Sequence, residues 1–119
     1  PSENSVSTSL KLGQNYGLKS VEISEIIACF LGEIGSEIIN TIKINGILLT
    51  GGDTAIKTAL SLKISGTNII NEIEPGIPYC HFIEEHYKHI TVVTKAGAFG
   101  NDDSIYKVLT FLEKKSNNC

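Results

Sequence analysis

The chain has 119 residues, of which 41% are hydrophobic, and this length and composition allow a single domain with one ordinary core. Its net charge is −3 and all 10 basic residues are lysines that form no cluster, so we expect no nucleic-acid partner. There is no apolar run of about eighteen residues and no charged-then-apolar opening, so we expect a cytoplasmic protein that does not span a membrane.

The first part of the chain, residues 1–19, is rich in Ser, Asn, Gly and Lys and lacks sustained periodicity. We interpret it as a flexible lead-in or an incomplete element that precedes one domain over 20–115. From Ser20, a plausible N-cap, apolar residues recur at the spacing of an amphipathic helix. This stripe consists of Ile23, Ile26, Ile27, Phe30 and Ile34, and it resumes at Ile38 and Ile39. Gly32 and Gly35 are expected to weaken the helix locally.

An apolar run over 44–50, bounded by glycine, predicts a buried strand. The run ends at Gly51-Gly52, and Asp53 is a suitable N-cap for a helix over 54–63. The inner face of that helix is expected to carry Ile56, Ala59 and Leu60.

A second strand is predicted over 68–74, and Pro75-Gly76 suit the central positions of a type II turn. Residues 79–89 fit no single element, whereas the β-branched run over 90–94 predicts a third strand.

A loop over 95–101 leads into a last helix, which Asn101 or Asp102 would cap. The apolar stripe of this helix comprises Ile105, Val108, Leu109 and Leu112. Because helices alternate with short apolar strands, we predict an α/β fold, a Rossmann-like layered domain whose short central sheet has helices on both faces.

The segment Thr50-Gly51-Gly52-Asp53-Thr54-Ala55 follows a strand and precedes a helix, where free backbone N–H groups can hold an anion. Asp53 could cap the helix, bind a ribose hydroxyl or contact a metal through water. An ordinary tight turn with an N-cap explains the segment equally well, since it is neither a P-loop nor a G-x-G-x-x-G motif.

The segment 94–101 repeats this arrangement after the last predicted strand. Lys95 can serve as a point charge for phosphate, and Gly97 and Gly100 let the backbone approach a ligand. For Asp102 and Asp103 we favour helix capping over Mg²⁺ binding. Because the chain has no arginine, any phosphate must be held by lysine, hydroxyls and main-chain N–H groups.

The segment Glu74-Pro75-Gly76-Ile77-Pro78 is typical of a rigid turn, and nothing in the sequence supports a ligand contact by Glu74. Cysteines and histidines are scattered at Cys29, Cys80, His81, His86, His89 and Cys119. Their spacing matches neither a disulfide framework nor a zinc site, so no metal ligand is assigned.

Together the three motifs resemble the C-terminal nucleotide-binding domain of four-carbon acid sugar kinases, the family of threonate, erythronate and 3-oxo-tetronate kinases. The matching stretches are L-L-T-G-G-D-T-A at 48–55, E-P-G-I-P at 74–78 and V-V-T-K-A-G-A-F-G-N-D-D at 92–103. The resemblance covers about 44–112 and rests on the order and spacing of motifs that are individually weak.

The resemblance implies a carbohydrate kinase, a transferase that moves the γ-phosphate of ATP, with Mg²⁺, to a hydroxyl of a four-carbon sugar acid. It places Gly51, Gly52, Asp53, Thr54 and Gly97 in the ATP site, with Lys95 as a secondary candidate. The family's N-terminal domain, which holds the sugar acid and an Asp-rich catalytic motif, has no counterpart here. We therefore expect a fragment of a two-domain kinase that is inactive alone and whose catalytic residues are unknown. A homo-oligomer is left open.

Two other interpretations compete with this one. A non-catalytic α/β module could use the same loops to bind another phosphorylated ligand or a partner chain. Diacylglycerol and NAD kinases also use a Gly-Gly-Asp motif, but usually with glycine after the aspartate, where this chain has Thr54.

Overall fold

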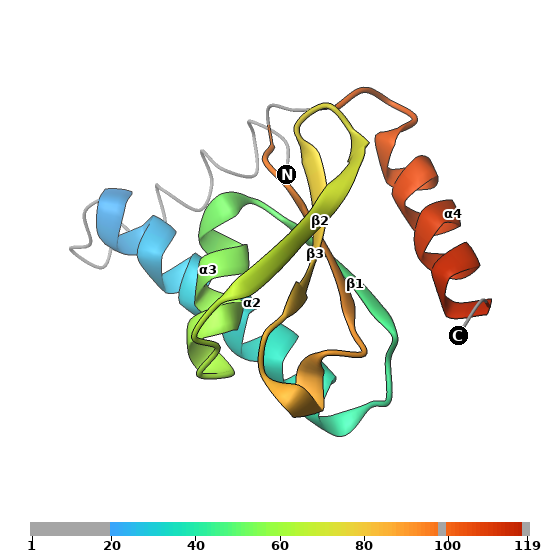
Figure 1. The fold of residues 1–119 in the computed structure, drawn as a ribbon. Coiled ribbons are helices and arrows are strands. Elements are labelled where there is room, and N and C mark those ends of the chain that lie inside the picture. Colours follow the sequence, from blue (N-terminus) through green and yellow to red (C-terminus); the bar gives the residue numbers. More distant parts are fainter. Residues whose placement is uncertain (1–19, 98–99, 118–119) are drawn as a thin grey trace.

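The computed structural model describes residues 20–97 and 100–117, so the predicted lead-in over 1–19 lies outside the described residues. The elements are α2 (Ser20–Thr41), β1 (Gly46–Thr50), α3 (Gly52–Ser61), β2 (Thr67–Glu74), β3 (Ile77–Phe82), a 3-10 helix (Glu85–Tyr87), β4 (Thr91–Lys95) and α4 (Ser104–Asn117). Figure 1 shows α2 and α3 on one side of the sheet and α4 on the other. The predicted α/β class with helices on both faces is confirmed.

The sheet has four strands in the order β1-β4-β3-β2. β1 and β4 are parallel, whereas β3 pairs antiparallel with both β4 and β2. The β2–β3 hairpin turns at Pro75-Gly76, where Gly76 has the positive φ of 84° that the third position of a type II turn requires. β3 lies largely in the segment that fits no single element from its sequence, because Pro78 and His81 break the apolar alternation of a strand.

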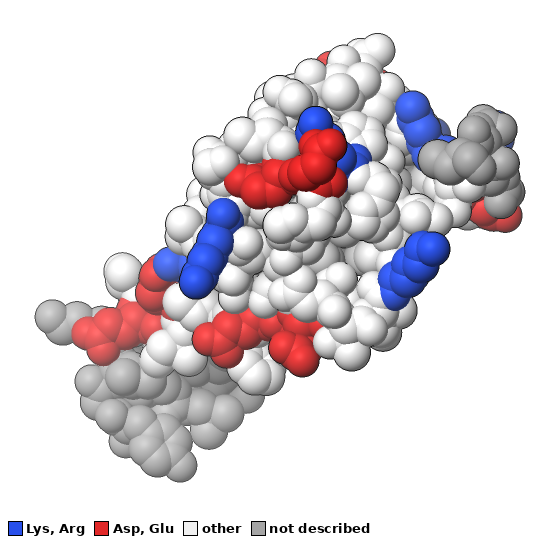
Figure 2. Space-filling view, turned by 60° about the horizontal axis from the view of Figure 1, so that its bottom comes forward, with Lys and Arg blue, Asp and Glu red and all other residues white. Residues whose placement is uncertain are grey.

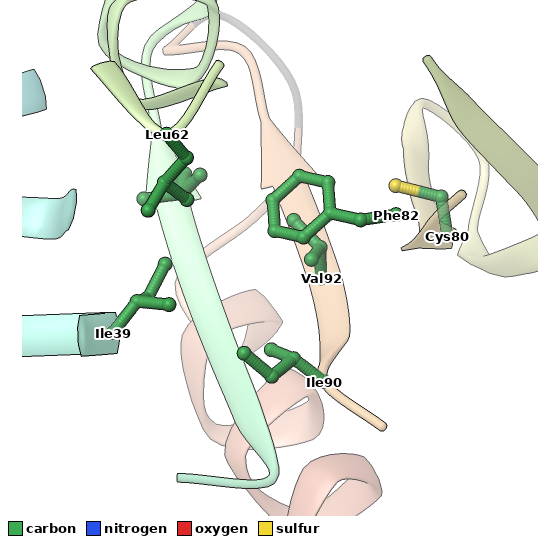
Figure 3. Packing of buried hydrophobic residues seen from close by; sticks show 7 residues of the cluster. Ile39, Leu62, Cys80, Phe82, Ile90 and Val92 are labelled. Atoms are coloured by element: carbon green, nitrogen blue, oxygen red, sulfur yellow. The ribbon is translucent and has the colours of Figure 1, made fainter. Parts of the chain in front are cut away.

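Each face of the sheet carries its own part of the core. Leu49 and Val92 belong to one buried cluster with Ile39 of α2, Cys80 and Phe82. Figure 3 shows Val92 together with the Ile39, Cys80 and Phe82 side chains of this cluster. The neighbouring residues on the same strands, Leu48 and Val93, pack on the opposite face against Val108 of α4 and its neighbours. Because both faces are covered, β1 and β4 read as continuous apolar runs, as the sequence predicts.

The two helices on one face pack through their small side chains. A Cβ added to Gly32 would lie 2.6 Å from Cβ of Lys57, and one added to Gly35 would lie 2.9 Å from Oγ1 of Thr58. The Ser36 and Ser61 hydroxyls are hydrogen-bonded at 3.0 Å. The contacts advance along both helices in the same order, so the two helices run in the same direction. The glycines that were expected to weaken α2 therefore form its contact with α3, since they let the backbones approach closely.

The predicted apolar faces of α2 and α3 are wrong in part, because the two helices pack so closely. Ile26 and Phe30 of α2 are 54% and 62% exposed, and Ile56 and Leu60 of α3 are 58% and 62% exposed. Instead Thr58 is the buried residue of α3. The largest apolar side chains do not fit between helices that approach at glycine, so they lie outside the contact.

The last helix follows its predicted stripe in part. Val108 is fully buried and the Leu112 side chain packs against Gly46, whereas Ile105 and Leu109 are about half exposed. Lys114 and Lys115 lie in the last turn, where positive charge suits the helix dipole. None of the described helices is long and apolar enough to cross a membrane.

Candidate functional site: two glycine-bearing loops at one sheet edge

The two glycine-bearing loops lie side by side because their strands are parallel neighbours. Thr50 is paired with Lys95, the last residues of β1 and β4. The Gly51 N–H donates to the Lys95 carbonyl at 2.8 Å, so the ladder continues into both loops. The structure thereby brings together the motif at 50–55 and the described residues of the motif at 94–101, at the carboxyl edge where α/β proteins bind ligands.

Gly51 makes the turn from β1 into α3. It has φ 91° and ψ 128°, a conformation that L side chains rarely adopt, and it stands at the N-cap position without a side-chain capping bond. Its carbonyl accepts the Ala55 N–H at 3.2 Å. The expected N-cap Asp53 is therefore wrong, because α3 begins one residue earlier at Gly52 and places Asp53 inside the first turn.

Two features make the start of α3 suited to an anion. No side chain caps the first turn, so its N–H groups keep the partial positive charge of a helix N-terminus. A Cβ added to Gly52 would meet no atom within 4 Å, so the backbone faces open space there. Thr54 is half-buried, and its Oγ1 would lie 3.6 Å from a Cβ on Gly51, which places a hydroxyl beside the turn.

Asp53 borders a polar hollow of about 260 Å³ between the starts of α2 and α3. The hollow is lined by Ser20, Val21, Ser24, Glu25 and Asp53. Nearby, the Lys57 ammonium pairs with the Glu25 carboxylate, and this hydrogen bond raises the pKa of Lys57. Ser20, the predicted N-cap of α2, is already helical in the structure.

The second loop leaves β4 at Lys95, whose half-buried side chain reaches the Ala96 carbonyl with Nζ at 3.4 Å. A Cβ on Gly97 would meet no atom within 4 Å, which matches the open space at Gly52. Gly100 differs, because its φ is 89° and a Cβ there would lie 2.5 Å from Ser104 Oγ. Positions 98 and 99 lie outside the described residues.

α4 begins at Ser104, later than a cap at Asn101 or Asp102 predicts, and an Asx turn at Asn101 precedes it. Asn101 Oδ1 accepts the Asp103 N–H at 3.0 Å, and Ser104 Oγ accepts the Asn101 N–H at 2.7 Å. Asp102 and Asp103 are exposed at this turn.

Sequence reasoning missed one contact near the site, between Glu74 and Ser104. The Ser104 hydroxyl donates to the Glu74 carboxylate, which also pairs with Lys107 at 3.3 Å. The hydrogen bond from Ser104, with help from Lys107, lowers the pKa of Glu74. The sequence carries no local signal for this contact, since Glu74 and Ser104 are 30 residues apart.

Elsewhere in the described part of the chain, the charged and histidine side chains are spread over the surface. On the face drawn in Figure 2, acidic and basic side chains are interspersed among uncharged ones without a broad basic area. His81 Nδ1 donates to the Lys88 carbonyl at 2.8 Å, which ties β3 to the turn before β4. Within residues 20–97 and 100–117, no three His, Cys, Asp or Glu side chains are grouped to hold a metal ion.

An apolar groove of about 240 Å³ runs beside the loops, along the sheet face next to α3. It begins at Leu49 and Thr94 near the strand ends, is flanked by Ala55, and extends over β3 to Ile69 of β2.

Known proteins are similar to this chain in sequence and in fold. Residues 1–105 match the family described as the nucleotide-binding C-terminal domain. A D-threonate kinase from Salmonella typhimurium is 34% identical over 103 residues, which are 87% of this chain and 24% of that protein. A D-erythronate kinase from Heliobacterium modesticaldum is 26% identical over 105 residues, again 87% of this chain and 24% of that protein. The chain thus spans about a quarter of the length of these relatives.

Solved structures agree with this relationship. A domain of unknown function from Bordetella bronchiseptica, determined with bound citrate as a domain-swapped dimer, matches with a TM-score of 0.64 at 29% identity, over 77% of this chain and 22% of that one. A structure from Salmonella typhimurium LT2 matches with a TM-score of 0.72 at 21% identity, over 91% of this chain and 24% of that one, and supports the fold alone.

Proposed function

This chain belongs to the family of nucleotide-binding C-terminal domains of four-carbon acid sugar kinases, and we propose that its ATP site is the edge where β1 and β4 end. The observation that carries the proposal is the junction of Gly51 and Lys95. It holds two loops together while leaving the backbone open at Gly52 and Gly97. Two open glycines from different segments at one edge suit a ligand that touches backbone rather than side chains.

Each residue of the site has a role in this proposal. The uncapped first turn of α3 binds phosphate oxygens through its N–H groups, and the Thr54 hydroxyl adds a donor. Lys95 supplies a point charge from the neighbouring strand. The Asp53 carboxylate, an oxygen ligand of the kind Mg²⁺ prefers, fits a water-mediated contact to that ion, which would neutralise phosphate charge. The apolar groove beside Leu49 offers a surface for the base.

For the whole protein we propose phosphorylation of a hydroxyl of a four-carbon sugar acid such as threonate or erythronate. The names of the relatives support this, and the chain spans about a quarter of their length. Phosphoryl transfer requires the acceptor and its base to be positioned in line with the γ-phosphate. We therefore expect the 119-residue chain to bind nucleotide without transferring phosphate by itself.

Substituting Gly52→Ala tests the site, because the added methyl group meets no protein atom but would stand where the phosphate approaches. We expect thermal stability to be unchanged. The Kd for ADP and for MgATP, measured by calorimetry, should rise at least about tenfold, since one close backbone contact is lost. Gly66→Ala is the matched control, because its methyl group would meet only the flexible end of Ile83, at 3.2 Å.

Equal nucleotide affinity in Gly52→Ala and the unchanged chain would contradict this site. Binding of inorganic phosphate without any preference for nucleotide would instead favour a module for another phosphorylated ligand. Asp53→Asn and Lys95→Ala extend the test, since both should weaken nucleotide binding only if the loops hold ATP.

A further inference from the structure

Glu74 ends β2 directly before the Pro75-Gly76 turn, yet its side chain is only 15% exposed. One carboxylate oxygen accepts the hydroxyl proton of Ser104 and the other pairs with Lys107 Nζ. Both partners belong to the first turns of α4, so Glu74 joins the hairpin to the segment that follows the second loop. Neither the fold's core nor the proposed phosphate contacts require this half-buried carboxylate.

Ser104 connects Glu74 to the loop. Its side chain is fully buried, and its Oγ accepts the Asn101 N–H at 2.7 Å while donating to Glu74. Gly100 packs directly on this hydroxyl, and the position of its missing Cβ is also 3.2 Å from Lys95 Cε. The Ser104 hydroxyl therefore supports Asn101 and Gly100 directly, and the Lys95 side chain lies beside Gly100.

The carboxylate also fixes the direction of the hydroxyl. A carboxylate is only an acceptor, so Ser104 must give its proton to Glu74 and keep a lone pair for the Asn101 N–H. A side-chain amide at position 74 could donate to Ser104 instead and turn that hydroxyl away from Asn101. The arrangement thus depends on an acceptor at position 74 and benefits from its charge.

We propose that Glu74 is a positioning residue for nucleotide binding: acting through Ser104 Oγ, it holds Gly100 and Asn101, and with them Lys95, in place beside the Gly51-Gly52 turn. The part of this proposal that concerns the ligand rests on the proposed function. The part that concerns the loop does not, because it can be measured without any nucleotide.

The first experiment measures hydrogen exchange of the Asn101 N–H by NMR in the unchanged chain and in Glu74→Ala, Glu74→Gln and Glu113→Gln. Glu113 is an exposed carboxylate on α4, the helix that contains Ser104, and serves as the control. We expect exchange about tenfold faster in Glu74→Ala, an intermediate rate in Glu74→Gln and no change in Glu113→Gln, with the core strand residues Val92 and Val93 unaffected. Unchanged Asn101 exchange in Glu74→Ala would overturn the proposal. If Glu74→Ala does not fold, Glu74→Gln decides.

The second experiment measures ADP affinity in the same variants, in Ser104→Ala and in the double variant Glu74→Ala/Ser104→Ala. We expect Glu74→Ala and Ser104→Ala each to weaken binding about tenfold, Glu74→Gln to weaken it less and the control Glu113→Gln to leave it unchanged. The double variant should bind no more weakly than Glu74→Ala or Ser104→Ala alone, since both remove one support. If the losses of ADP affinity in the two single variants add up in the double variant, Glu74 does not act through Ser104. If the unchanged chain binds no nucleotide, the proposed function fails, and the exchange result alone then decides whether Glu74 holds the loop.

Discussion

At the scale of single residues, the glycines of the two loops serve different purposes. Gly51 and Gly100 take positive φ angles that other residues rarely adopt, so they shape the turns. Gly52 and Gly97 carry no such angle and face open space, so the fold itself does not explain them. A ligand that approaches the backbone explains them, and this is the residue-level basis of the proposed ATP site.

The pKa values of two carboxyl groups, Glu74 and Glu84, allow a prediction of how the stability of the fold depends on pH. The Ser104 hydroxyl, and to a lesser extent Lys107, lowers the pKa of Glu74 from its ordinary 4.5. The hydroxyl and N–H of Ser65, at 2.5 and 2.7 Å, lower that of Glu84, with a smaller contribution from His86. A carboxyl group whose pKa is lower in the folded than in the unfolded state stabilises the fold at pH values above its unfolded-state pKa. This stabilisation is lost as the pH falls through its folded-state pKa.

We therefore expect melting temperatures that change little from pH 7 to about 5 and decline below about 4.5. Thermal melts followed by circular dichroism at each pH measure this. The melting temperature of the double variant Glu74→Gln/Glu84→Gln should decline less steeply with falling pH than that of the unchanged chain. The melting temperature of the control Glu113→Gln should decline as steeply as that of the unchanged chain. Parallel declines in the unchanged chain and the double variant would contradict the assignment of these two carboxylates.

At the scale of elements, α2 and α3 depend on glycine at their contact. Gly32→Ala adds a methyl group 2.6 Å from Lys57 Cβ and 2.7 Å from the Lys57 carbonyl carbon, so one helix must move. Although alanine favours helix by about 1 kcal/mol, we expect overpacking to dominate and to lower the free energy of unfolding by about 1–3 kcal/mol. Urea denaturation measures the change, and Ser24→Ala on the exposed part of α2 is the control. A Gly32→Ala chain more stable than the parent would show that propensity outweighs packing.

The elements also show what sequence patterns can and cannot predict. Strands β1 and β4 were predictable, because both faces of the sheet are covered there and the central residues of each strand are apolar. The contact faces of α2 and α3 were not, because hydrophobic periodicity identifies Phe30 and Ile56 while close packing selects Gly32 and Thr58. The two loops were found as separate motifs, since each has local turn chemistry. The Glu74–Ser104 contact was not, because it depends on tertiary structure alone.

At the scale of the whole molecule, the parallel pairing of β1 and β4 is what makes one site from two motifs. Loops whose sequences begin some 45 positions apart in the chain, at Thr50 and Lys95, become hydrogen-bonded neighbours. The hairpin between them reaches the same region through Glu74 and the start of α4. All three motifs that resemble the sugar-acid kinases therefore converge at one end of the molecule, although the proposed ATP site uses groups from only two of them.

The most direct test of the ATP site is an NMR titration of the 119-residue chain with ADP and MgATP, following backbone amide shifts. We predict that the largest shifts occur at 51–55 and 94–97 and extend to Gly100 and Asn101, with small changes at the far ends of the strands. A folded chain whose amides at these two loops do not shift, even at millimolar nucleotide, would contradict the proposed site.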